Sequence, residues 1–158
     1  MNKIIFTVGC PGSGKTTWAK DKQDTSPIGE VIRLNRDDIR ENLFGNRYHI
    51  SYGGKHMKQY EELVTSVQIN TCNSILALNK DVTIIFDDTN ADYKRLMQLM
   101  KMYNSSNCKV EIVYFTDTPL ETCLERNSKR ARKVPEDIIR NMYNKSLETM
   151  HELEKLSY

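Results

Sequence analysis

Long apolar runs, paired cysteines and an excess of charge of one sign are all missing from this sequence. No run approaches the roughly 18 apolar residues of a membrane-spanning helix, so no membrane partner is expected. The four cysteines are scattered and form no C-x-x-C pair, which argues against a zinc site and a disulfide framework. Lysine and arginine number 23 against 21 aspartates and glutamates, so a nucleic-acid partner would have to meet a local basic patch.

Glycine and proline are also scarce, with seven and four residues, and they are not gathered into a linker. Because no internal repeat or low-complexity tract occurs either, residues 1–158 are predicted to form a single domain. The apolar run at the N-terminus is too short for a secretion signal. Together with the unpaired cysteines, this predicts a cytoplasmic protein, located in the host cytoplasm if the source is viral.

Short β-branched runs alternate with longer helical patterns, which is typical of a parallel sheet covered by helices. The expected strands are Lys3–Val8, Val31–Leu34, Val82–Phe86 and Lys109–Phe115. The expected helices are Lys15 to about Lys22, Asp37 to about Leu43, Lys58–Leu78, Tyr93–Tyr103, a segment capped by Thr118 that runs to about Asn127, and a C-terminal segment opened by Pro135. The predicted fold is therefore α/β, with a central four-stranded, mainly parallel sheet flanked by helices.

The segment after the first expected strand fits the pattern G-x-x-x-x-G-K-S/T of a phosphate-binding loop. It reads Gly9-Cys10-Pro11-Gly12-Ser13-Gly14-Lys15-Thr16 and opens an expected helix, which is the context that the pattern requires. Backbone N–H groups at such a helix start point at phosphate oxygens. Lys15 is expected to reach the β- and γ-phosphates of a nucleoside triphosphate, and the Thr16 hydroxyl to ligate Mg²⁺.

Other segments indicate which kind of triphosphate-using protein this is. An Asn-Lys-x-Asp guanine-reading motif, as in GTPases, is absent, and motors are usually longer than 158 residues. A kinase needs a base that takes a hydroxyl proton, and Asp37 and Asp38 follow the second expected strand, at the edge where parallel sheets gather their active sites. Aspartates at a helix start also serve as caps, and the spacing alone leaves both readings open.

Two further polar segments fit the same chemistry. Asp87-Asp88-Thr89-Asn90 ends the third expected strand, where one aspartate could hold Mg²⁺ directly or through water. The segment Arg126–Lys133 carries five basic residues in eight. A helix end with its loop could have this composition, but it also suits a basic lid that closes over a triphosphate.

These blocks, in this order, resemble the kinase domain of the bacteriophage polynucleotide kinase-phosphatase family. The matching blocks are Gly9–Ala19, Asn35-Arg36-Asp37-Asp38 with Arg40, Asp88-Thr89-Asn90, and Arg126-Asn127-Ser128-Lys129-Arg130 with Val134-Pro135. The resemblance implies an adenylate-kinase-like P-loop fold with a basic helical lid, and Mg²⁺- and ATP-dependent phosphorylation of the 5′-hydroxyl end of DNA or RNA. The residues expected to contact ATP are Gly9, Cys10, Pro11, Gly12, Ser13, Gly14, Lys15, Thr16, Thr17, Arg126 and Arg130.

The resemblance also implies roles for residues of the acceptor side. Asp37 corresponds to the general base, and Arg40 to the residue that binds the acceptor phosphate. Asp88 and Thr89 would lie near the reacting groups, with Asp88 as a candidate Mg²⁺ ligand, and Val134 against the terminal base or sugar. The catalytic residues expected on this basis are Asp37, Lys15 and Arg130. A homo-oligomer is compatible with the resemblance but is not predicted by the residues.

Two departures from the family pattern affect these expectations. The lid is one residue shorter between Arg130 and Val134, so either Arg130 or Arg132 could meet the phosphates. No D-x-D-G-T motif occurs, so phosphatase activity is not expected.

Residues proposed for the acceptor channel are Arg36, Arg40, Arg47, Lys55 and Lys58, with Tyr48, Tyr52 and Tyr60 as candidates for base stacking. The rival hypotheses are a P-loop kinase acting on a nucleoside, nucleotide or sugar, and a nucleotide-gated binding module.

Overall fold

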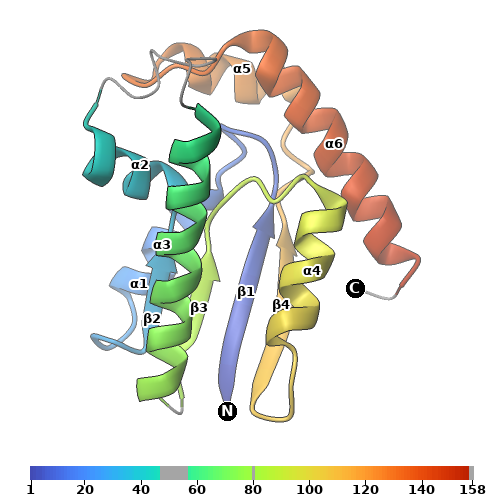
Figure 1. Ribbon diagram of the computed structural model, residues 1–158. Coiled ribbons are helices and arrows are strands. Elements are labelled where there is room, and N and C mark those ends of the chain that lie inside the picture. Colours follow the sequence, from blue (N-terminus) through green and yellow to red (C-terminus); the bar gives the residue numbers. More distant parts are fainter. Residues whose placement is uncertain (47–56, 80, 157–158) are drawn as a thin grey trace.

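A four-stranded parallel sheet forms the centre of the computed structural model, which describes residues 1–46, 57–79 and 81–156 (Figure 1). Its strands are β1 (Asn2–Val8), β2 (Val31–Leu34), β3 (Thr83–Phe86) and β4 (Cys108–Tyr114), in the order β2-β3-β1-β4. All three strand pairings are parallel, with Ile4 of β1 opposite both Ile84 and Val110. The predicted α/β architecture is confirmed, and the observed strand bounds differ from the expected ones by a single residue at several ends.

Six helices surround the sheet within the described ranges. They are α1 (Lys15–Asp24), α2 (Arg36–Phe44), α3 (Met57–Leu78), α4 (Tyr93–Tyr103), α5 (Leu120–Ser128) and α6 (Glu136–Glu154). Helices α3 and α4 cover one face of the sheet and α1 lies behind it, while α5 and the start of α6 lie beyond the carboxyl ends of the strands (Figure 1). This arrangement leaves the carboxyl edge of the sheet facing the loops that carry the sequence motifs.

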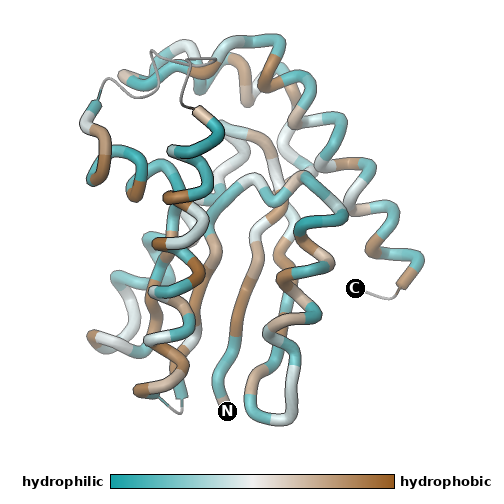
Figure 2. Tube along the Cα trace, in the orientation of Figure 1, coloured by the Kyte–Doolittle hydropathy of each residue, from teal (hydrophilic) through white to brown (hydrophobic). Residues whose placement is uncertain are grey.

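The core is built on β1 and β3, whose central residues form apolar runs because helices cover both faces of these strands. Their fully buried side chains include Ile4, Phe6, Ile84 and Phe86, and the rings of Phe6 and Phe86 pack 4.8 Å apart. Figure 2 shows this hydrophobic centre in β1, with hydrophilic residues recurring along the surrounding helices. No helix in the described part of the chain is long and apolar enough to cross a membrane.

The start of α5 differs from the prediction. Thr118 was expected to cap this helix, but Pro119 is the N-cap residue and no side chain caps the end. The Thr118 hydroxyl instead donates a hydrogen bond to the backbone carbonyl of Ser13, 3.0 Å away. The capping pattern is therefore correct about where a helix begins and wrong about the partner of Thr118, because the phosphate-binding loop lies within its reach.

The expected basic lid is only partly helical. Arg126 and Asn127 belong to α5, which ends at Ser128, whereas residues 129–135 form an irregular loop. The buried side-chain amide of Asn127 donates to the carbonyl of Val134 at 2.7 Å and accepts from its N–H at 2.9 Å. This pairing satisfies both backbone hydrogen-bonding groups of Val134 and holds Val134 close to α5. The basic residues between Asn127 and Val134 therefore lie in a compact loop.

Candidate active site

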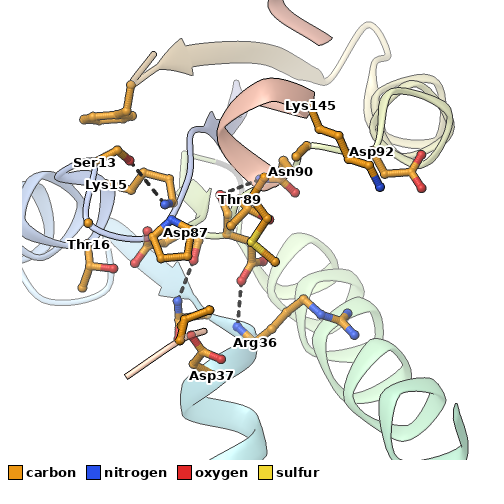
Figure 3. A pocket seen from close by; sticks show the side chains of 18 of the residues that line it. Ser13, Lys15, Thr16, Arg36, Asp37, Asp87, Thr89, Asn90, Asp92 and Lys145 are labelled. Carbon is orange, nitrogen blue, oxygen red and sulfur yellow. Dashed lines mark hydrogen bonds between the residues drawn. The ribbon is translucent and has the colours of Figure 1, made fainter. Parts of the chain in front are cut away.

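A cleft of about 1650 Å³ opens at the carboxyl edge of the sheet, and every predicted motif contributes to its wall. The phosphate-binding loop of residues 9–16 forms one side, the start of α2 and the segment after β3 form the floor, and α3, α4, α5 and α6 complete the rim (Figure 3). Because loop residues at this edge come from separate strands, donor and acceptor groups can be held in a single cleft.

Lys15 holds the phosphate-binding loop closed on itself. Its buried ammonium donates to the carbonyl of Cys10 at 2.8 Å and lies 3.4 Å from the Ser13 hydroxyl (Figure 3). Burial lowers the pKa of Lys15, and the neighbouring carboxylate of Asp87 acts in the opposite direction. The lysine is thus desolvated and directed into the loop, where a phosphate group would supply the anionic partner.

The loop is tied to the rest of the site by contacts from three directions. The N–H of Gly9 donates to the carbonyl of Thr89 at 3.1 Å, and Arg126 Nη1 donates to the carbonyl of Gly12 at 3.0 Å. At Gly12, with a φ of +84°, an added Cβ would lie 2.7 Å from the carbonyl oxygen of Cys123 in α5. The glycine therefore permits both the backbone turn and the close approach of α5.

We expect Gly12→Ala to destabilise the fold and to weaken triphosphate binding. The positive φ costs about 1–2 kcal/mol, and the overlap with α5 adds roughly 1–3 kcal/mol. Chemical denaturation and nucleotide titration measure the two effects. Gly29→Ala is the matched control, since Gly29 has a φ of +87° but nothing within 4 Å of its added Cβ. An equal loss of stability in both variants would contradict the proposed contact with α5.

Cys10 is a packing residue of the loop. It is buried with Cys123 and Ile139 in a small cluster that joins the loop to α5 and α6. Burial raises the pKa of the Cys10 thiol to about 12, and the nearby Cys123 acts in the same direction. The raised pKa favours the protonated thiol at neutral pH, in keeping with a packing role.

The two aspartates after β3 have different surroundings. Asp88 accepts hydrogen bonds from the backbone N–H of Arg36 at 2.9 Å and from the Gln68 side chain at 2.7 Å, so both of its oxygens are engaged. Burial raises its pKa, which these two donors partly counteract. The Asp87 side chain, by contrast, is fully buried. Its Oδ2 accepts from Arg33 Nε at 2.7 Å, while its Oδ1 has no hydrogen-bond partner within the described structure.

The unpartnered oxygen of Asp87 is the feature of this site that fits a divalent cation. A buried carboxylate oxygen without a donor is costly unless another group satisfies it, and Mg²⁺ prefers oxygen ligands. Thr16 and Asp87 both line the cleft and lie on either side of Lys15 in Figure 3. Thr16, Asp87 and the triphosphate oxygens therefore make a suitable set of ligands, whereas the oxygens of Asp88 already have donors.

The start of α2 distinguishes between the two interpretations of its aspartates. Asn35 is the N-cap, because its side-chain oxygen accepts from the N–H of Asp38 at 2.9 Å, and its amide donates to the carbonyl of Asp87 at 2.6 Å. Asp38 pairs with Arg33 at 2.6 Å. Capping is thus performed by Asn35, and Asp37 lines the cleft with a side chain that is 43% exposed.

Asp37 is held by a network of arginines and glutamates. Arg40 Nη1 donates to Asp37 Oδ1 at 2.8 Å, and the other side of the same guanidinium binds Glu61 of α3 at 2.7 and 3.0 Å. This bidentate pairing fixes the plane of the Arg40 guanidinium and, through it, one oxygen of Asp37. The other oxygen of Asp37 accepts no hydrogen bond from the described residues, and Asp37 lines the cleft.

The three arginines of the lid lie in three different surroundings. Arg126 contacts the phosphate-binding loop at Gly12, and Arg130 lines the cleft. Arg132 reaches α2, where it pairs with Glu41 at 2.6 Å and lies 3.6 Å from Asp37. Between the two arginines that the sequence could not separate, Arg130 is therefore the one on the cleft wall, while Arg132 ties the lid to α2.

The remaining predicted residues are placed as follows. Thr89 and Val134 line the cleft, and Asn90 anchors the floor by donating to the Thr7 carbonyl at 2.7 Å. Tyr60, proposed for stacking, packs against Phe44 with ring centroids 4.6 Å apart. Arg36, Arg40 and Lys58 line the cleft as expected of channel residues. Arg47, Lys55, Tyr48 and Tyr52 lie outside the described residues.

Several residues that line the cleft or support its carboxylates were not singled out from the sequence. Arg33 links Asp87 to Asp38, Gln68 holds Asp88, and Arg95 and Lys145 line the far wall. One signal was present for Arg95, because it stands in the first turn of α4, where the helix dipole disfavours cations. Arg33, within a short strand, and Gln68, in the middle of a helix, carried no comparable signal.

Comparison with known proteins identifies relatives along almost the whole chain. A family model described as an AAA domain matches residues 4–153. A protein of Autographa californica nuclear polyhedrosis virus, provisionally named bifunctional polynucleotide kinase/RNA ligase, is 29% identical over 153 residues, covering 92% of this chain and 21% of that protein. The L-seryl-tRNA(Sec) kinase of Methanococcus maripaludis is 30% identical over 148 residues, covering 90% and 51%. The chain thus spans about half or less of the length of these relatives.

Solved structures give the same picture of the fold. A chain in the structure of the Pnkp1/Rnl/Hen1 RNA repair complex matches with a TM-score of 0.77 at 25% identity, over 96% of this chain and 46% of that chain. Deoxyadenosine kinase from M. mycoides matches with a TM-score of 0.56 at 17% identity, over 99% and 84%, a likeness in fold alone. The P-loop kinase fold expected from the sequence is confirmed.

Proposed function

The chain belongs to the AAA-domain family of P-loop kinases, and we propose that within this family it transfers the γ-phosphate of ATP to the 5′-hydroxyl end of DNA or RNA. The observation that carries this proposal is the pairing of the phosphate-binding loop with Asp37 and Arg40 on the walls of one cleft. A relative named as a polynucleotide kinase and the likeness to a chain of an RNA repair complex support the choice of acceptor.

On the donor side, the loop and the lid bind the triphosphate. The N–H groups at the start of α1 face the phosphates, and the Lys15 ammonium exchanges its carbonyl partner for a phosphate oxygen. Arg130 approaches from the lid and offsets the charge that develops on the transferring group. Mg²⁺, which Thr16 and Asp87 would help to hold, neutralises phosphate charge when bound.

On the acceptor side, Asp37 orients the hydroxyl. One of its oxygens is held by Arg40, and the other accepts the hydroxyl proton as the oxygen attacks phosphorus in line with the leaving group. Arg40 and the buried Arg36 provide positive charge for the phosphate that follows the attacked nucleoside. Asn127 positions Val134 on the cleft wall, where an apolar side chain suits a sugar or base.

The test is transfer of labelled γ-phosphate from ATP to a 5′-hydroxyl oligonucleotide in the presence of Mg²⁺. The parallel acceptors are a 5′-phosphorylated oligonucleotide, a nucleoside 3′-monophosphate and a free nucleoside. Label on the 5′-hydroxyl strand but not on its 5′-phosphorylated counterpart is expected. Label on the free nucleoside alone would favour a small-acceptor kinase, and label on no acceptor would favour a nucleotide-gated module.

The second candidate is a P-loop kinase that phosphorylates a hydroxyl other than a strand end, the small-acceptor kinase included, because one relative is named for a different acceptor. The relative with 30% identity is named for a seryl-tRNA rather than a nucleic-acid end. The same loop, lid and carboxylate base could serve such an acceptor. Acceptor competition separates the two, since a 5′-hydroxyl oligonucleotide in excess should block transfer to every smaller acceptor if the strand end is the natural substrate.

Asp87→Asn should raise the Mg²⁺ concentration needed for half-maximal transfer by about tenfold, whereas Asp88→Asn should not. The reason is that Asp87 has the oxygen without a donor, while both oxygens of Asp88 are engaged. Activity titrated with Mg²⁺ measures the effect, and thermal unfolding checks for damage from the altered pairing with Arg33. A larger shift in Asp88→Asn than in Asp87→Asn would assign the cation to Asp88 instead.

A further inference from the structure

A row of three arginines lies along one side of helix α3 in the cleft. Glu61 pairs bidentately with Arg40 and lies 3.7 Å from Arg36. One helical turn further, the Thr65 hydroxyl accepts from Arg36 Nη1 at 2.9 Å and from Arg95 Nη2 at 3.4 Å. The row therefore runs from Arg40 through Arg36 to Arg95, and a turn of helix advances it by about 5.4 Å.

The far end of this row has more positive than negative charge. Arg40 has two carboxylate partners, Asp37 and Glu61, whereas Arg95 has no carboxylate within ion-pair distance among the described residues. Arg36 and Arg95 share a neutral hydroxyl. Burial together with the charges of Arg95 and Arg40 lowers the pKa of Arg36 to about 10, although Asp88 and Glu61 act in the opposite direction. An anion bound between two neighbouring, partly buried guanidinium groups lowers their mutual repulsion and forms charge-assisted hydrogen bonds with them.

The same end of the cleft is reached from above by another cation. Lys145 extends from α6 toward Asn90 and Asp92 (Figure 3), and it lines the cleft together with Arg95. The carboxylate of Asp92 is used as the N-cap of α4, accepting from the N–H of Arg95 at 3.1 Å. Arg95, at the first turn of α4, and Lys145, which extends toward the N-cap residue of that helix, thus both line the cleft near the start of α4.

We propose that Arg95, with Arg36 and Lys145, forms a second phosphate subsite that binds the second internucleotide phosphate of the acceptor strand. This inference rests on the proposed function and deepens it, because Arg40 is the subsite for the first phosphate and the row continues beyond it. The substrate class that such a row selects is a strand of three or more nucleotides rather than a nucleoside monophosphate. Phosphate contacts of this kind fix the register of a strand without reading its bases.

The test compares two 5′-hydroxyl trinucleotides that differ only at the second internucleotide phosphate, which is native in one and a neutral methylphosphonate in the other. For the wild-type protein, the KM should be on the order of tenfold higher for the methylphosphonate acceptor. In Arg95→Gln the KM for the native acceptor should rise to nearly that value, and the difference between the two acceptors should largely disappear. Arg95→Lys, which keeps the charge, should restore part of the difference.

Lys94→Gln is the matched control, because Lys94 is the exposed neighbour of Arg95 on α4 and does not line the cleft. It should retain the full difference between the two acceptors. The proposal is overturned if Arg95→Gln keeps the wild-type difference, or if it raises the KM for both acceptors by the same factor. Unfolding midpoints of the two variants should match the wild type, since the described bond from the Arg95 side chain is a single long one to Thr65.

A direct binding measurement tests the second phosphate subsite independently of the proposed kinase activity. If the wild-type protein phosphorylates neither trinucleotide, the 5′-kinase function is overturned, and a trinucleotide labelled at its 3′ end is then titrated at several salt concentrations. Loss of one phosphate contact should reduce the slope of log affinity against log salt by about 0.7 in Arg95→Gln. An unchanged slope overturns the subsite, and a reduced slope supports it independently of catalysis.

Discussion

Replacement of Asp37 by alanine is expected to lower the rate of phosphoryl transfer by roughly 10²- to 10⁴-fold while leaving ATP affinity almost unchanged. Asp37 stands on the acceptor side of the cleft, and its contacts are to Arg40 and Arg132 rather than to the phosphate-binding loop. Its loss removes the group proposed to take the hydroxyl proton, without touching the residues that hold the triphosphate. Single-turnover transfer and nucleotide titration measure the two quantities separately.

Asp38→Ala is the control for this prediction, since it removes a carboxylate from the next residue of the same helix. Asp38 pairs with Arg33 and does not line the cleft, so its loss should affect stability more than turnover. Asp37→Asn is a second variant that keeps the shape of the side chain and its contact with Arg40. Near-normal turnover in Asp37→Asn would mean that Asp37 is not the base.

Replacement of Arg130 by alanine is expected to lower the transfer rate by about 10³-fold or more, the effect typical of losing an arginine that stabilises a transferring phosphoryl group. Among the lid arginines, Arg126 is bound to the carbonyl of Gly12 and Arg132 to Glu41, while Arg130 lines the cleft. Most of the loss should appear in the rate of the chemical step, because charge on the phosphoryl oxygens develops in the transition state. Rapid-quench kinetics at saturating ATP measures that step.

Lys129→Ala is the matched control for Arg130, because it removes the adjacent basic residue from the same loop. Lys129 is 73% exposed, pairs with Glu125 and does not line the cleft. Its loss should change the rate by less than about twofold, as is usual for an exposed pair. If Arg132→Ala lost more activity than Arg130→Ala, the catalytic arginine of the lid would be Arg132.

The sequence by itself determined the elements of the fold and the phosphate-binding loop. The apolar runs of β1 and β3 specify central parallel strands, because only strands covered on both faces lack polar alternation. The loop could be read because its chemistry resides in adjacent residues, where spacing along the chain is also spacing in the structure. For the same reason, the position of Lys15 in the loop was predictable.

The tertiary structure decided how each side chain of the cleft is used. The spacing left Asp37 and Asp38 open as base or cap and either Asp87 or Asp88 open as a Mg²⁺ ligand, and the resemblance singled out Asp37 and Asp88. The partners of each carboxylate come only from the tertiary structure. Gln68 engages Asp88 from 20 residues away, and Arg33 joins Asp38 to Asp87, which is 54 residues from Arg33. A carboxylate oxygen can accept a proton or bind a cation most readily when it does not already accept hydrogen bonds. Tertiary packing determines which donors lie next to it.

The lid shows the same division between sequence and structure. The sequence Arg126–Lys133 showed that the lid is basic, but it did not show which group each arginine contacts. The lid is one residue shorter than in the family pattern, and a change in loop length alters the direction in which the side chains of the loop point. Asn127 fixes that loop by pairing with the backbone of Val134, seven residues away. Composition therefore predicted a charged segment at the cleft, and the tertiary structure determined that Arg130 lines the cleft while Arg132 pairs with α2.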